Sequence, residues 1–150
     1  MNLPARSEDN NRSNGMTLME LLLVIALIMI LAASTTPFLS RFILQTNLDA
    51  TVDKLVGTIR KAQEYAMDGK DGAVWGVCKF NDMIRMYSGS CASPTMSENF
   101  SIPATVTLTN FTDVTFNIRG EPSAPLTITL TTTLESTTVE LNTAGSTNVY

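Results

Sequence analysis

Residues 14–33 read NGMTLMELLLVIALIMILAA. Of the 18 residues that begin with Met16, 16 are apolar, and from Leu21 to Ala33 no side chain is polar. A helix over residues 16–39 would be about 36 Å long, enough to cross a hydrocarbon core of about 30 Å. Because a helix that is apolar on every side has to be buried in lipid or protein, we predict a membrane-spanning segment over residues 16–39.

A core helix and a secretory signal peptide would also account for such a segment. A core helix is disfavoured, because a chain of 150 residues offers about one domain and little second layer to cover it. A signal peptide would be cut near Ala32-Ala33-Ser34. Against it, the apolar run is long and a helical pattern continues past that point. Residues 1–15 carry two arginines and two acids, so the positive-inside rule favours a cytoplasmic amino terminus only weakly.

One acid, Glu20, interrupts the apolar block. A carboxylate inside a membrane costs about 2.5–3.5 kcal/mol at the centre and less near the headgroups. A local explanation is that Thr17 to Glu20 form a capping box, which satisfies free amides at a helix start. The functional explanation is an unpaired carboxylate that receives a cation from another chain.

The sequence over residues 14–20, followed by the apolar run, resembles the processing site of type IV prepilins and pseudopilins. The resemblance implies that a membrane enzyme, the prepilin peptidase, cuts between Gly15 and Met16 and methylates the new amino terminus of Met16. Residues 1–15 would then be a leader peptide. Methionine as the first mature residue, where phenylalanine is more usual, departs mildly from the family pattern.

The same resemblance implies how the chain is assembled. Glu20 would pair with the amino terminus of a neighbouring subunit, and Pro37 stands where pilins commonly carry a helix-kinking proline. The partners would be other pilin or pseudopilin subunits, the prepilin peptidase and an inner-membrane assembly platform. The chain would cross the cytoplasmic (inner) membrane once, with its C-terminal domain outside the cytoplasm, and then enter a filament.

Beyond Pro37 the apolar pattern becomes one-sided. Six residues at spacings of 4, 3, 4, 3 and 4 share one helix face, namely Leu48, Val52, Leu55, Ile59, Ala62 and Ala66. Asp68-Gly69 supplies a stop signal. We therefore predict one nearly continuous helix from about residue 17 to about residue 68.

From residue 73 onward, two-residue alternation and many threonines predict strands. The expected strands are Ala73–Phe80, Ile84–Tyr87, Thr105–Leu108, Val114–Ile118, Leu126–Thr132, Thr137–Leu141 and Asn148–Tyr150. Gly89–Pro103 and Gly120–Pro125 are expected to be loops. The predicted fold class is α+β and pilin-like: a long N-terminal helix, transmembrane in its first half, packs on an antiparallel β-sheet. Residues 40–150 would form the soluble globular domain.

Three further segments resemble the GspH/FimT group of minor pseudopilins and minor pilins. These are residues 55–77, the stretch Phe116 to Pro122 (FNIRGEP) and the glycine turn Ala144-Gly145. The resemblance implies a phenylalanine strand that meets an Arg-Gly turn before the final strands.

The chain has two cysteines, Cys78 and Cys91. They are either free and buried or, in a domain outside the cytoplasm, joined in a disulfide that closes a hairpin. Two thiols without histidine do not favour a metal site, so no metal or cofactor is expected. Trp75 and Tyr87, on neighbouring strands, are expected to pack in the core or across strands rather than to form a binding surface.

Composition excludes several functions. With no histidine, a Ser-His-Asp or Cys-His pair is impossible, and we expect no enzyme. The leading hypothesis is a structural subunit, a minor pseudopilin or minor pilin precursor of a type II secretion pseudopilus or a type IV pilus. A FimT-like DNA-binding pilin is less favoured, because Arg119 is the only cation in residues 92–150 and the net charge is −4. The sequence is also compatible with a major pilin of the shaft and with an unprocessed single-pass protein.

Overall fold

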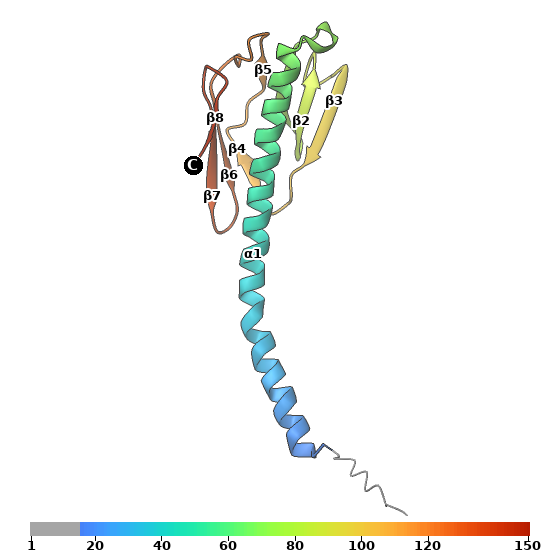
Figure 1. The fold of residues 1–150 in the computed structure, drawn as a ribbon, viewed down its shortest axis with the longest axis vertical. Coiled ribbons are helices and arrows are strands. Elements are labelled where there is room, and N and C mark those ends of the chain that lie inside the picture. The colour runs from blue at the N-terminus through green and yellow to red at the C-terminus, as the bar shows by residue number, and fades with distance from the viewer. Residues whose placement is uncertain (1–15) are drawn as a thin grey trace, which may run out of the picture. The chain divides into compact units, whose positions relative to one another are not determined.

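The computed structural model describes residues 16–150, and within them the side chains of all residues except 34–37. Helix α1 (Leu18–Met67) comes first and is followed by a short 3-10 helix, η1 (Lys70–Gly72), and eight strands (Figure 1). The predicted helix, from about residue 17 to about residue 68, is confirmed. The chain divides into two units, one that ends at Phe38 and one that comprises Leu39–Tyr150.

In the N-terminal unit, α1 exposes its apolar side chains. From Leu21 to Leu31 the large apolar residues are between 36% and 67% exposed. None of the most apolar stretch is buried, and α1 is long and apolar enough to cross a membrane. The segment therefore does not behave as a core helix of the described chain, in agreement with the predicted membrane-spanning segment.

In the C-terminal unit, α1 buries one face. The six apolar residues predicted to share that face are at most 7% exposed and belong to the hydrophobic core. Two threonines on the same part of the helix, Thr51 and Thr58, are also buried. Their hydroxyl groups donate hydrogen bonds of 2.7 and 2.6 Å to the carbonyl oxygens of Asn47 and Lys54, four residues earlier. The polar atoms on the buried face are thus satisfied within the helix itself.

The end of α1 follows the predicted glycine signal. Gly69 has a φ of 60°, in the left-handed region that favours glycine, and the chain turns there into η1. The indole N–H of Trp75 donates a 3.0 Å hydrogen bond to the carbonyl oxygen of Lys70, which fixes η1 against the first strand.

The strands form two antiparallel sheets, so the predicted sheet region has two parts. The first has the order β3-β2-β1-β5, and the second has the order β4-β6-β7-β8. Figure 1 shows α1 of this unit with β2 and β3 on one side and β6, β7 and β8 on the other. The bounds are β1 (Trp75–Phe80), β2 (Met83–Ser88), β3 (Met96–Ser101), β4 (Thr107–Thr109), β5 (Val114–Phe116), β6 (Leu126–Thr131), β7 (Ser136–Leu141) and β8 (Thr147–Val149).

One strand contradicts the sequence analysis. The prediction of a loop over Gly89–Pro103 is wrong in its second half, because β3 pairs with β2 over six residues, from Met83 opposite Ser101 to Ser88 opposite Met96. The sequence of β3, MSENFS, has no β-branched residue and little alternation, so its propensity is weak. The sequence of β3 favours a strand only weakly, so the hydrogen bonds to the edge of β2 are what stabilise it.

Several strand boundaries also differ, and β1 begins at Trp75 rather than at Ala73. The strand predicted over Val114–Ile118 ends at Phe116, because the Asn117 side chain accepts hydrogen bonds from the amides of Arg119 and Glu121 and closes a turn. The strand predicted over Thr105–Leu108 is β4, which begins two residues later. A single core joins α1 to strands of both sheets.

Candidate functional site

The start of α1 is fixed by Thr17. Its hydroxyl oxygen accepts a hydrogen bond of 3.2 Å from the backbone amide of Glu20, and its carbonyl oxygen accepts one of 3.1 Å from the amide of Leu21. This is the threonine half of the expected capping box. The cap uses the backbone amide of Glu20, so it leaves the carboxylate available for another role.

The Glu20 carboxylate lies on an exposed and otherwise apolar surface. Met16, Leu18 and Met19 are 60%, 77% and 80% exposed, and Glu20 is exposed as well. Within residues 16–150, Glu20 has no ion-pair partner. In lipid, an ionised carboxylate among such neighbours costs about 2.5–3.5 kcal/mol at the centre and less near the headgroups, so a cation supplied from outside the chain would stabilise it.

The cleavage site and the proline are less fully described. Gly15, the residue before the predicted cut, lies outside the described residues, whereas Met16 is described and exposed. Cleavage between them and methylation of Met16 stay predictions. Pro37 lies within α1, but its side chain is not among those described. The kink at Pro37 also stays a prediction.

Cys78 and Cys91 form a disulfide, with their Cα atoms 6.3 Å apart. The bond ties the middle of β1 to the segment that leads from β2 to β3. Arg85 supports the same segment, since its guanidinium donates to the carbonyl oxygen of Cys91 (2.8 Å) and to the side-chain oxygen of Asn99 (2.9 Å). The cysteines are therefore paired rather than free. Among residues 16–150 no cluster of acids and cysteines could hold a metal ion.

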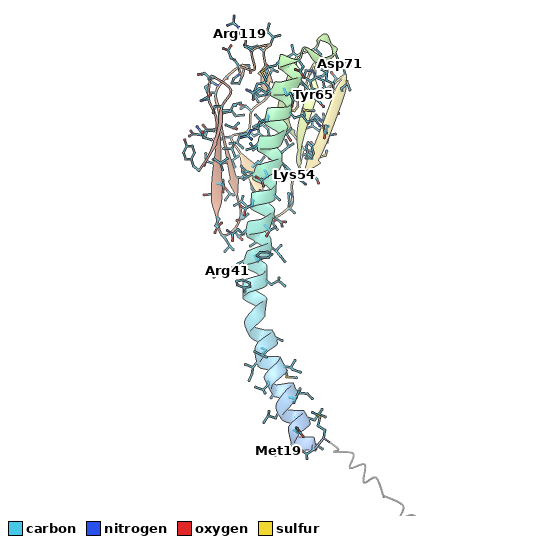
Figure 2. All side chains as sticks on the ribbon, viewed as in Figure 1. Met19, Arg41, Lys54, Tyr65, Asp71 and Arg119 are labelled. Atoms are coloured by element: carbon cyan, nitrogen blue, oxygen red, sulfur yellow. A yellow bond between two sulfur atoms is a disulfide. The ribbon has the colours of Figure 1, made fainter. Side chains whose placement is uncertain are left out.

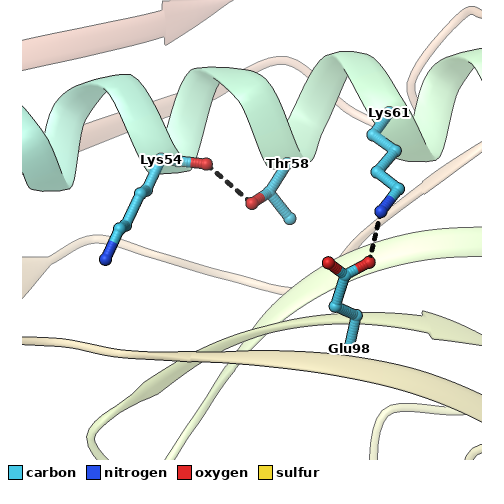
Figure 3. A network of polar contacts seen from close by, with 4 residues as sticks. All are labelled: Lys54, Thr58, Lys61 and Glu98. Atoms are coloured by element: carbon cyan, nitrogen blue, oxygen red, sulfur yellow. Dashed lines mark hydrogen bonds and ion pairs between the residues drawn. The ribbon is translucent and has the colours of Figure 1, made fainter.

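An ion pair joins α1 to β3. The Lys61 ammonium lies 2.5 Å from a carboxylate oxygen of Glu98. Figure 3 shows this pair and, separately, the hydrogen bond from the Thr58 hydroxyl group to the Lys54 carbonyl oxygen. The hydrogen bond to Glu98 raises the pKa of Lys61 above its ordinary value of 10.5. Both side chains are more than a third exposed, so the pair contributes little to stability and serves to orient β3.

Sequence reasoning missed the role of Gln63. Its side-chain amide donates hydrogen bonds to the carbonyl oxygens of Gly120 (2.6 Å) and Gly145 (3.0 Å). These glycines belong to the Arg-Gly turn and to the terminal glycine turn, which the resemblance named separately. The structure brings both turns to one helix residue. No spacing in the sequence indicates this contact, because the three residues are far apart along the chain.

Trp75 and Tyr87 are core residues, as expected, with 2% and 1% of their surfaces exposed. The Trp75 ring packs edge-on against Tyr65, with 4.9 Å between ring centroids. The Tyr87 hydroxyl group donates a hydrogen bond to the Asp113 carboxylate. Burial, followed by this hydrogen bond, raises the pKa of Tyr87 above its ordinary value of 10.0.

Comparison with known families gives one finding. Residues 10–36 match the prokaryotic N-terminal methylation motif. The matched region includes Gly15, Met16 and Glu20, and its later part is the exposed apolar segment of α1. The motif supports the pilin and pseudopilin superfamily. No curated protein and no solved structure matches the chain.

Proposed function

We propose that the chain is a minor pilin or minor pseudopilin precursor, cut between Gly15 and Met16 and assembled through its N-terminal helix into a filament. The observation that carries the proposal is the methylation motif over residues 10–36, whose described part includes the apolar start of α1. None of the most apolar stretch of α1 is buried, so a membrane or other subunits would have to cover it. In this proposal the chain is a structural subunit that acts by packing its N-terminal helix against those of other subunits.

Glu20 is the proposed assembly residue. After cleavage, the ammonium group of Met16 on one subunit pairs with the Glu20 carboxylate of the next. At 4 Å such a pair is worth about 1 kcal/mol in water, and about 4 kcal/mol at an effective dielectric constant of 20. The apolar environment therefore makes the pair a strong constraint on the register of neighbouring helices, and leaves a subunit with an unpaired Glu20 less stable.

The C-terminal unit presents the surface of the proposed filament. Its helix face is buried against its own sheets, and the Cys78–Cys91 disulfide suits a domain outside the cytoplasm. The resemblance to the GspH/FimT group concerns the Arg-Gly and Ala-Gly turns. The Gln63 side chain donates a hydrogen bond to each of these turns, which supports the proposal that they act as one structural feature. A DNA-capturing role is not favoured, because residues 92–150 carry a single cation, Arg119.

A substitution at Glu20 tests the assembly proposal. Glu20→Ala should leave membrane insertion intact but lower incorporation into sheared filaments by about tenfold or more, since about 1.4 kcal/mol is a factor of ten. Glu20→Gln should behave alike, because it keeps the size and removes the charge. The measurement is the ratio of the subunit in the filament fraction to the subunit in the membrane fraction.

The matched control is Glu64→Ala, which removes an exposed acid from α1 in the C-terminal unit. It should assemble like the unchanged chain. Normal incorporation of both Glu20 variants would sink the pairing role. Abundance in the same filaments separates a minor subunit from a major one, since a shaft subunit would dominate the preparation.

A further inference from the structure

The C-terminal unit has a hollow of about 320 Å³ between α1 and the loop that joins β6 to β7. It is lined by Arg41 and Gln45 from α1 and by Thr132, Leu134 and Glu135 from the loop. Figure 2 shows Arg41 on α1 toward one end of this unit and Arg119 at the other end. The hollow therefore lies near the first residues of this unit, which begins at Leu39.

The loop is held in one conformation by Thr132, which is 9% exposed. Its hydroxyl oxygen accepts hydrogen bonds from the amides of Leu134 (3.3 Å) and Glu135 (3.1 Å). The backbone amide of Thr132 also donates a 2.8 Å bond to the carbonyl oxygen of Glu135. Because these bonds fix the backbone, the side chains of Leu134 and Glu135 are presented on a preformed turn. Leu134 nevertheless remains 50% exposed.

The hollow carries two opposite charges that do not neutralise each other. Arg41 and Glu135 both line it, yet neither forms an ion pair with the other or with a different residue in the described part of the chain. A guanidinium favours a phosphate, and a carboxylate favours a cation that donates hydrogen bonds. The arrangement is thus complementary to a ligand that carries both groups on one short chain.

Exposed apolar side chains flank Arg41 on α1. Leu39, Phe42 and Ile43 on α1 are 58%, 57% and 49% exposed, and Arg41 stands among them. Arg41 follows the predicted membrane-spanning segment, residues 16–39, by two residues in the sequence. It therefore falls where that segment would leave the membrane, a position at which long basic side chains and aromatic rings commonly lie among the headgroups.

We propose that this hollow binds the headgroup of a phospholipid that carries a phosphate and a primary ammonium, a phosphatidylethanolamine. The Arg41 guanidinium contacts the phosphate, the Glu135 carboxylate accepts from the ammonium, and Leu134 and Phe42 contact the acyl region. A purely anionic lipid fits less well, since Glu135 repels it. The site would seat the globular unit on the membrane before assembly. This inference rests on the membrane anchoring in the proposed function.

Native mass spectrometry of the full chain in detergent tests this site. The probes are dioleoyl phosphatidylethanolamine, phosphatidylcholine and phosphatidylglycerol at equal concentration. The unchanged chain should bind phosphatidylethanolamine about tenfold better than phosphatidylcholine, whose quaternary ammonium has no N–H to donate. Glu135→Gln should abolish that preference, and Arg41→Gln should weaken binding of all three lipids. Arg60→Gln on α1 and Glu140→Gln on β7 remove exposed charges away from the hollow and should change neither result.

Equal binding of phosphatidylethanolamine and phosphatidylcholine overturns the proposal, as does an unchanged preference in Glu135→Gln. A chain dimer that forms without lipid and is lost in Arg41→Gln also overturns it, since the occupant is then a second copy. Recovery of the chain in carbonate-washed vesicles is measured alongside. If the chain is not retained there, the anchoring of the proposed function fails as well; if it is retained without a lipid preference, this inference alone fails. The oxidised mass of each variant confirms that the Cys78–Cys91 disulfide is intact.

Discussion

One helix residue, Gln63, holds two turns of the C-terminal unit. Its side-chain amide holds the carbonyl oxygens of Gly120 and Gly145, and the carbonyl oxygen of Gly120 lies close to Gly145 itself. At the same scale, the sequence was sufficient to single out Glu20 as a candidate, because a charge in an apolar run is visible without a structure. Gln63 was not identifiable, since a polar residue on the flank of an amphipathic helix is ordinary and its two acceptors are backbone atoms.

Gln63→Ala should therefore destabilise the C-terminal unit. The substitution removes two hydrogen bonds and leaves two carbonyl oxygens without their protein donor. Loss of such a partner typically lowers the free energy of unfolding by about 1–3 kcal/mol. Denaturant unfolding, followed by the fluorescence of the single tryptophan, the buried Trp75, measures the change. The neighbouring Glu64→Ala, at an exposed position, should lie within about 0.5 kcal/mol of the unchanged chain. Equal stability of the two variants would contradict the role of Gln63.

Two glycine-to-alanine changes should have opposite effects. At Gly145, φ is +81° and an added Cβ would lie 2.4 Å from the carbonyl oxygen of Gly120, so Gly145→Ala should cost more than about 1 kcal/mol. At Gly57, inside α1, nothing lies within 4 Å of an added Cβ. Gly57→Ala should stabilise by about 0.5–1 kcal/mol, because alanine is the better helix former. The same unfolding measurement reads both, and a Gly145→Ala variant as stable as the unchanged chain would show that the turn does not require glycine.

The elements differ in how far the sequence predicted them. Helix α1 and strands β1 and β2 were predicted to within about two residues from periodicity and glycine signals, which are local. Strand β3 did not, because its pairing depends on the edge of β2, the Cys78–Cys91 disulfide and the Lys61–Glu98 pair. These are contacts between elements, and a sequence pattern within β3 does not contain them. The choice between free and paired cysteines likewise needed the distance between β1 and the loop before β3.

The contact of Tyr87 on β2 with Asp113 before β5 should appear in the pH dependence of stability. Because the pKa of Tyr87 is raised by folding, its contribution is full below about pH 10, the pKa of an unfolded tyrosine, and is lost as the pH rises toward the folded value. Tyr87→Phe should cost about 1 kcal/mol at neutral pH, through the lost hydrogen bond. Its stability should then fall less steeply above pH 10 than that of the unchanged chain. Parallel alkaline curves would contradict the assignment.

The molecule combines two different parts. The most apolar stretch of α1 is not buried at all, whereas the C-terminal unit has its own hydrophobic core and a disulfide. Composition and patterning predicted this division and the α+β class. The separation of the strands into two sheets was beyond the sequence, because strand order is set by which edges meet. In the proposed function, the apolar part of α1 becomes an assembly element only after the chain is cut before Met16.

Mass spectrometry of the membrane-bound chain tests that claim most directly. Trypsin cuts after Arg12 and Arg41, so an unprocessed chain yields a peptide of residues 13–41. A processed chain should yield instead a peptide of residues 16–41 that carries one methyl group on the amino terminus of Met16. An unmethylated peptide of residues 13–41, or a mature chain that begins near Ser34 as after signal-peptide cleavage, would contradict it.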